Sequence, residues 1–286
     1  MKTRQGVYIF IMVIFAIACV ALRTTQLLFA VDAATGYERN NYTSSVVLYV
    51  LISFAALFFL TSLFSLKKTG ISYSISDFLK NGPFTVILMH LIALTLIITS
   101  GISLNNVFKS ARLSYPELIL PVSGILFAVF LLLTVYKFKA PVGAGFKAFT
   151  LIPTLWGAVG LVSIFINYIS IANISSQVFE LIMQISFTLA LFYIMKTAAI
   201  GGANRAAFCF GLCAVFFCMI SSIPQLILFN RSQFTAQAAA IDKVSFVCGL
   251  ILNVLLGLYI LTVLAKMTKT AQAPAEEELQ TEAESI

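Results

Sequence analysis

Long apolar runs alternate along the chain with short polar segments that hold most of its charges. Eight runs have about 20 residues or more, enough for an α-helix to cross the ~30 Å hydrocarbon core of a bilayer. The runs lack the two-residue alternation of membrane β-barrels, so the pattern predicts an all-α bundle of eight spans. The predicted spans are residues 7–30, 45–66, 84–104, 116–136, 148–172, 176–195, 206–229 and 243–265.

The composition supports this prediction. Hydrophobic residues make up 60% of the 286 residues and charged residues only 10%, against roughly 25% charged in soluble domains. The net charge of +7 would suggest a nucleic-acid partner for a soluble chain, but here most Lys and Arg residues lie in short loops between apolar runs. We therefore expect the lipid bilayer as the partner, with contacts to anionic head groups, and no nucleic acid.

The distribution of Lys and Arg predicts the orientation of the chain. With the N-terminus in the cytoplasm, 12 of the 18 basic residues lie in inside segments, 5 lie in outside loops and Arg23 lies in a span. Cytoplasmic loops carry the excess of positive charge, so both termini are expected in the cytoplasm. Residues 1–270 are predicted to form the transmembrane helical domain, and residues 271–286 a short disordered acidic cytoplasmic tail.

Arg23 is an unusual residue for a membrane span. It lies about seven residues, or ~10 Å, below the outer end of the first run. A charged side chain in hydrocarbon costs several kcal/mol unless it meets a partner, a wet cavity or the interface. Helical side chains tilt toward the helix N-terminus, which here is the inner side, so the natural direction of Arg23 is away from the outer interface.

Other polar side chains fall at a similar depth. Gln26 lies one turn above Arg23 on the same helix face. In the fifth and sixth spans polar residues recur at helical spacing toward the predicted outer end, and the seventh span adds an amide after a proline. These residues are Ser163, Asn167, Ser170, Glu180, Gln184, Thr188, Pro224 and Gln225.

This arrangement has two interpretations. In the first, spans one, five, six and seven line an outward-open polar cavity, where the guanidinium of Arg23 binds a carboxylate or phosphate group. In the second, Arg23 and Glu180 form an internal ion pair, and amides join the helices by hydrogen bonds. The candidate ligand-binding residues of the first interpretation are Arg23, Gln26, Asn167, Glu180 and Gln184.

The other reactive residue types do not indicate catalysis or metal binding. The five cysteines lie inside apolar runs without CxxC spacing, so neither a metal site nor a cofactor is expected. His90 has no acidic residue at helical spacing and is predicted to be a hydrogen-bonded packing residue. The spans hold no nucleophile–base pair or paired aspartates, so the chain is not expected to be an enzyme.

Two features predict packing and depth. Gly249, Asn253 and Gly257 recur every four residues in the last span, a spacing that favours close contact between helices. Trp156, near the cytoplasmic start of the fifth span, is expected at the membrane interface.

Two stretches resemble a group of uncharacterised bacterial polytopic membrane proteins. One is an RxxQLL…DxxTG[FY] motif at the outer end of the first span, and the other is the turn between spans five and six. The matching residues are Arg23, Gln26, Leu27, Leu28, Asp32, Thr35, Gly36 and Tyr37, and then Asn173, Ile174 and Ser175. The resemblance implies a bacterial plasma membrane and brings no activity with it.

Two functions from different classes stay open. The first is binding or transport of a small anionic or zwitterionic solute, or of a lipid head group, in the outward-facing polar cavity. The alternative is a structural or accessory subunit of a membrane complex that has no ligand of its own.

Overall fold

The fold comes from a computed structural model that describes residues 2–31, 43–65, 82–109, 115–136, 149–168, 175–200, 204–229 and 243–270. Within these ranges the chain forms eight α-helices, the first of which continues into a π-helical turn. They are α1 (Lys2–Thr25) with η1 (Gln26–Ala30), α2 (Thr43–Ser65), α4 (Gly82–Lys109), α5 (Tyr115–Tyr136), α7 (Ile152–Tyr168), α8 (Ser175–Ile200), α9 (Asn204–Leu228) and α11 (Lys243–Thr270). The predicted tail, residues 271–286, lies outside the described residues.

Each predicted span corresponds to one helix, which confirms the all-α bundle. Seven of the described helices are long and apolar enough to cross a membrane. The eighth, α7, has 17 residues and is about 26 Å long at ~1.5 Å per residue, shorter than the apolar run from which it was predicted. The protein is therefore a multi-pass membrane protein.

The outward faces of the helices carry large apolar side chains. Phe10 on α1 is 67% exposed, Phe54 on α2 is 62% exposed and Phe64 on α2 is 86% exposed. In water such side chains would cost free energy, whereas lipid tails solvate them. This surface explains why helices apolar on all sides are stable here.

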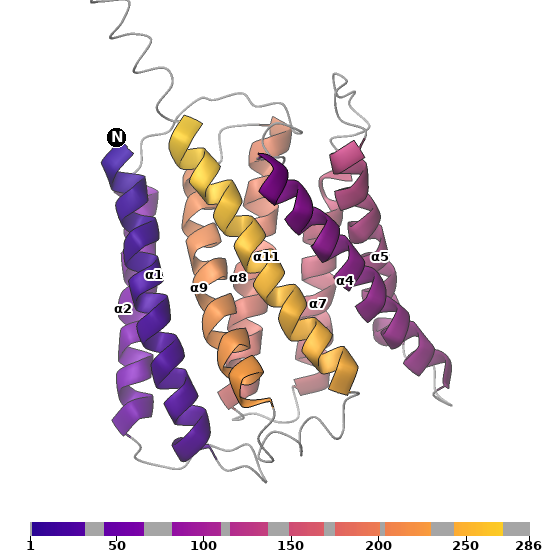
Figure 1. Cartoon of the computed structure of the whole chain (residues 1–286), viewed down its shortest axis with the longest axis horizontal. Helices are drawn as coiled ribbons and strands as arrows, with labels where there is room; N and C mark the ends of the chain where they lie inside the picture. The colour runs from indigo at the N-terminus through magenta and orange to yellow at the C-terminus, as the bar shows by residue number, and fades with distance from the viewer. Residues whose placement is uncertain are drawn as a thin grey trace, which may run out of the picture.

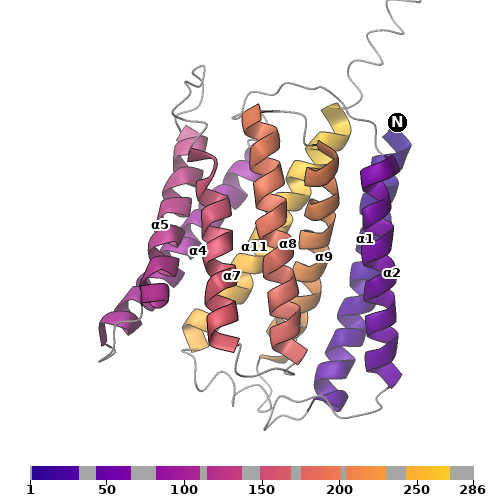
Figure 2. The same cartoon turned by 180° about the vertical axis from the view of Figure 1, so that it is seen from behind.

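The helix α9 packs between the α1–α2 hairpin on one side and α8 and α11 on the other, with α4 and α5 farther from the hairpin (Figure 1). Within the described part of the chain, 72% of the α9 span is buried, against 22% of the α1 and α2 spans. Successive helices run antiparallel, so α1 begins and α11 ends at the same end of the bundle (Figure 1). Seen from behind, α7 and α8 lie in front of α11 (Figure 2).

Small residues bring α9 and α11 into close contact. A Cβ atom on Gly257 would lie 3.0 Å from the sulfur of Cys218, and the Cys218 thiol donates a hydrogen bond of 2.8 Å to the carbonyl oxygen of Asn253. Gly249 differs, because a Cβ atom there would meet nothing within 4 Å. The predicted packing stripe is therefore confirmed at Gly257, whereas Gly249 faces open space.

Polar side chains also join neighbouring helices near the end of the bundle that holds the N-terminus. The hydroxyl of Tyr8 on α1 donates to Thr61 Oγ1 on α2 over 3.0 Å, because the Thr61 hydroxyl itself donates to the Phe58 carbonyl. His90 Nδ1 donates to the Val86 carbonyl oxygen over 2.7 Å, so its Nε2 accepts from the Tyr136 hydroxyl over 2.7 Å. His90 thus joins α4 to α5, and its predicted packing role is confirmed.

The prediction for Trp156 was wrong. Its side chain is only 9% exposed and packs against Phe127 of α5, with ring centroids 5.4 Å apart. The indole also lies beside Gly124 of α5, where an added Cβ atom would be in ordinary contact with the indole nitrogen at 3.5 Å. The neighbours that bury Trp156 belong to another helix, which a helix-depth argument could not show.

Candidate functional site

Arg23 lies at the end of α1 and is 1% exposed. Its Nη1 donates a hydrogen bond to Gln26 Oε1. The amide nitrogen of Gln26 in turn donates to Ser45 Oγ over 3.1 Å and to the Tyr49 hydroxyl over 3.3 Å, both on α2. One acceptor bond and two donor bonds use the main hydrogen-bonding directions of the Gln26 amide and fix its orientation.

The guanidinium of Arg23 also contacts α8. Its central carbon lies 4.1 Å from the ring centroid of Phe179, within the range of a cation–π interaction. The Tyr49 ring lies nearly parallel to Phe179, at 6.2 Å and 18°. We call Arg23, Gln26, Ser45, Tyr49 and Phe179 the arginine cluster. It joins the α1–α2 hairpin to α8.

A π-helical turn follows the arginine. The amide of Val31 donates to the Gln26 carbonyl oxygen, five residues earlier, over 3.1 Å. Such turns are wider than an α-helical turn and are frequent at functional sites. Here the turn closes the first helix directly after the pair of Arg23 and Gln26, and it leaves Leu27 and Ala30 buried against the bundle.

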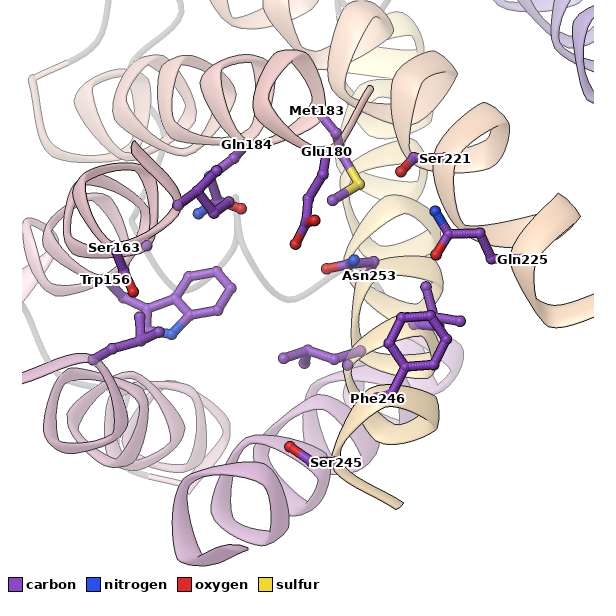
Figure 3. A pocket seen from close by; sticks show the side chains of 16 residues that line it. Trp156, Ser163, Glu180, Met183, Gln184, Ser221, Gln225, Ser245, Phe246 and Asn253 are labelled. Carbon is purple, nitrogen blue, oxygen red and sulfur yellow. The ribbon is translucent and has the colours of Figure 1, made fainter. Parts of the chain in front are cut away.

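A separate cavity of about 320 Å³ lies between α5, α7, α8, α9 and α11 (Figure 3). It occupies the part of the bundle where α8 and α11 begin and α9 ends, which is the end opposite to the N-terminus. Polar side chains from four helices line it, together with apolar residues that include Leu120, Ile164, Met183 and Phe246. The polar lining residues are Trp156, Ser163, Glu180, Gln184, Ser221, Gln225, Ser245 and Asn253.

The side chains of Glu180, Gln225 and Asn253 point toward the middle of this cavity (Figure 3). The indole of Trp156 extends toward the same space from the α7 side, and the ring of Phe246 flanks it on the α11 side (Figure 3). Gly249 borders the cavity as well, which accounts for the open space beside it.

The structure places the predicted site residues in two groups. Arg23 and Gln26 belong to the arginine cluster, whereas Glu180 and Gln184 line the cavity. Among the described residues, neither Arg23 nor Gln26 borders the cavity. Asn167 lies in α7, but its side chain is outside the described part of the structure. Instead of the single cavity expected around Arg23, the described residues form two neighbouring sites, the arginine cluster and the cavity.

Gln184 has a structural contact in addition to its place at the cavity. Its Nε2 donates to the Gly157 carbonyl oxygen of α7 over 3.1 Å. Gly160 accommodates the same side chain, because a Cβ atom there would lie 2.5 Å from Gln184 Nε2. The amide therefore joins α7 to α8, as expected for the interpretation in which amides connect helices.

Several contributors to these sites were missed in the sequence. Ser45 and Tyr49 have i, i+4 spacing at the outer end of the second span, which is a detectable signal for a polar stripe. Phe179 gave no signal, because a phenylalanine in an apolar run is ordinary. Ser245 was not noticed, and Asn253 was predicted to serve helix packing together with Gly249 and Gly257, whereas both residues line the cavity.

The chemistry of the cavity follows from its lining. Glu180 is the one acidic residue among the described lining residues, and Lys, Arg and His are absent from that set. The amides and hydroxyls can donate or accept hydrogen bonds. In the ranges that the structure describes, no three His, Cys, Asp or Glu side chains gather as metal ligands. The lining suits a solute with a positive charge and further hydrogen-bonding groups.

No family model, curated protein or solved structure matches the chain. The function is therefore inferred from the geometry of the two sites.

Proposed function

We propose that the protein binds a small cationic or zwitterionic solute in the cavity between α5, α7, α8, α9 and α11, and carries it across the membrane. Glu180 supplies the negative charge that holds the ammonium group of the solute. The observation that carries this proposal is a carboxylate directed into a cavity lined by apolar, aromatic and polar side chains, among which it is the one charged residue described (Figure 3).

Membrane physics supports a functional role for Glu180. Ionisable residues inside membrane proteins are costly, usually face the interior of the bundle, and mark ligand or ion pathways. A cavity of about 320 Å³ is at the small end of ligand sites, which span roughly 300–1,000 Å³. The rings of Trp156 and Phe246 can add cation–π attraction to the ion pair.

The location of Arg23 changes the class of solute that we favour. The sequence led us to expect a small anionic or zwitterionic solute or a lipid head group beside Arg23, whereas the Arg23 guanidinium contacts Gln26 and Phe179 in the arginine cluster. We assign Arg23 to holding the α1–α2 hairpin against α8. A zwitterionic solute stays within the proposal, since its anionic group can accept hydrogen bonds from the amides and hydroxyls of the lining.

We also propose that the protein resides in a bacterial plasma membrane with both termini in the cytoplasm. The excess of Lys and Arg in the segments on the side of the termini supports this orientation. The cavity then faces the outside, because it lies at the opposite end of the bundle. The proposal includes no chemical change of the solute.

Thermal unfolding of the purified protein in nanodiscs tests the proposal. The probes are four small compounds that share a phenyl ring: benzyltrimethylammonium (cation), phenylglycine (zwitterion), benzyl alcohol (neutral) and benzoate (anion). We expect the cation, and more weakly the zwitterion, to raise the melting temperature, and Glu180→Gln to abolish the effect of both. In proteoliposomes the same cation should enter with the wild type and not with the variant.

A control on the same helix is Thr197→Val, which removes a buried hydroxyl near the other end of α8, where it donates to the Tyr193 carbonyl oxygen. This variant should respond like the wild type. Stabilisation by benzoate alone, or an equal response of wild type and Glu180→Gln, would contradict the proposal. A protein that responds to none of the four probes and copurifies with a partner instead would favour the accessory-subunit alternative.

A further inference from the structure

We infer that the solute carries an apolar substituent, which lies in the open space beside Gly249 among the apolar side chains of α5, α7 and α11. The inference rests on the solute site proposed above and deepens it in two ways. It names the solute class as ammonium compounds with a hydrocarbon group, and it assigns to Gly249 the limit on the size of that group. The observations behind it are the unequal walls of the cavity and the room at one glycine (Figure 3).

The wall formed by α8 and α9 is mostly polar. Its polar side chains are Glu180, Gln184, Ser221 and Gln225, and Met183 is its apolar member. Ser221 is 4% exposed and Gln225 is 8% exposed, so their positions are fixed inside the bundle. A few well-placed polar groups usually set the orientation of a ligand in a largely apolar site. We therefore place the ammonium end of the solute at this wall.

The wall formed by α5 and α7 lies across the cavity from α9 and is more apolar (Figure 3). Leu120 of α5 packs over α7, since a Cβ atom on Gly160 would lie 3.8 Å from Leu120 Cδ1. Trp156 and Ile164 extend this surface along α7. In the described lining of this wall, the polar side-chain groups are the indole N–H of Trp156 and the hydroxyl of Ser163. Such a surface suits hydrocarbon.

The space between the walls is open at Gly249. Gly257, two turns later on the same helix, packs closely on α9, because a Cβ atom there would lie 3.0 Å from the Cys218 sulfur. A Cβ atom on Gly249 would meet no atom of the described chain within 4 Å, although this residue lines the cavity. A side chain at position 249 would therefore occupy cavity space and leave the contact between α9 and α11 intact.

The fold itself gives no reason for glycine at position 249. Alanine is the better helix former, and the described neighbours leave room for it. Binding of a solute supplies a reason, because the absent side chain keeps space for a ligand group. Water in the same space would have few hydrogen-bond partners beside Leu120, Ile164 and Leu250, whereas hydrocarbon gains from contact with them.

Isothermal titration calorimetry of the protein in nanodiscs tests the inference, with heats from empty nanodiscs subtracted. The probes are tetramethylammonium, butyltrimethylammonium and hexyltrimethylammonium, which share one charge and differ in hydrocarbon length. Burial of each methylene group can raise affinity by roughly threefold to fourfold. We expect the wild type to bind the hexyl compound at least tenfold more tightly than tetramethylammonium.

Variants of Gly249 locate this preference. Gly249→Leu should lose the preference for the hexyl compound and keep the affinity for tetramethylammonium within about twofold, and Gly249→Ala should be intermediate. The control is Gly101→Leu in α4, because Gly101 also has nothing within 4 Å of an added Cβ atom and does not belong to the described lining. This variant should bind all three compounds like the wild type. Melting temperatures close to that of the wild type show that each variant is folded.

The outcomes separate this inference from the proposed function. Equal affinities of the wild type for the three compounds, or an equal effect of the Gly249 variants on all three, would overturn the apolar subsite. Loss of tetramethylammonium binding in Glu180→Gln would still support the solute site in that case. Conversely, hexyltrimethylammonium binding that is weakened by Gly249→Leu and unchanged in Glu180→Gln would support the subsite and contradict the role of Glu180. Binding of none of the compounds would overturn both.

Discussion

The guanidinium carbon of Arg23 lies 4.1 Å from the ring centroid of Phe179, the residue that precedes Glu180 in α8. Two consecutive residues of one helix thus serve two sites: Phe179 faces the arginine cluster, and Glu180 lines the cavity. The hairpin of α1 and α2 is therefore connected to the helix that carries the proposed ligand anchor.

The contact between Arg23 and Phe179 should be measurable as a coupling free energy. Phe179→Leu and Arg23→Met, made singly and together, form a double-mutant cycle. We expect a coupling of about 1–2 kcal/mol from unfolding in denaturant, because a desolvated cation–π pair reaches this size. Phe187 is another buried phenylalanine of α8. The matched cycle of Arg23→Met with Phe187→Leu should give a coupling free energy close to zero. Equal values in the two cycles would contradict a specific contact.

Gln26→Leu should destabilise the protein by about 1–3 kcal/mol. The substitution removes the acceptor of the bond from Arg23 and the donor of the bonds to Ser45 and Tyr49, while the buried guanidinium stays behind. Thermal unfolding measures the loss. Thr25→Val is the control: Thr25 is exposed, and its hydroxyl donates only to the Leu22 carbonyl of its own helix. If Gln26→Leu lowers the stability less than Thr25→Val does, the hydrogen bonds of Gln26 contribute little to the stability of the fold.

Gly157→Ala should separate α7 from α8. A Cβ atom at this position would lie 2.9 Å from Thr188 Oγ1 and 3.3 Å from the Thr188 backbone, so the helices must move apart. Overpacking of this kind costs about 1–3 kcal/mol, and it should also weaken the bond from Gln184 to the Gly157 carbonyl. Gly101→Ala in α4, where nothing lies within 4 Å, should leave stability unchanged or slightly higher. Similar melting temperatures for both variants would rule out a tight α7–α8 contact.

The sequence predicted the helices well because each span is a long apolar run with charges at its ends. The start of α11 at Lys243 and the end of α5 at Tyr136 agree with the predicted limits. The predicted span, residues 148–172, was longer than α7, since Phe149 and Leu151 are apolar and yet precede this helix in the structure. Apolar composition alone does not say where helical hydrogen bonding begins.

The candidate site was predicted only in part. Spacing along one helix correctly joined Arg23 to Gln26 and placed Glu180 with Gln184, because i, i+3 and i, i+4 residues share a face. Which helices are neighbours is not encoded in such spacing. Residues at equal depth were therefore assigned to one cavity, although α1 packs beside α2 and α9 while α11 supplies Asn253 to the cavity. The position of Trp156 was missed for the same reason.

The central claim is that the carboxylate of Glu180 holds a cation in the cavity. Equilibrium binding of radiolabelled benzyltrimethylammonium to nanodisc-reconstituted protein at pH 8 tests it most directly, with Glu180→Gln compared with the control Thr197→Val. We predict saturable binding of one molecule per chain for wild type and Thr197→Val, and a loss of at least tenfold in affinity for Glu180→Gln. Binding of equal affinity in all three proteins would contradict the claim.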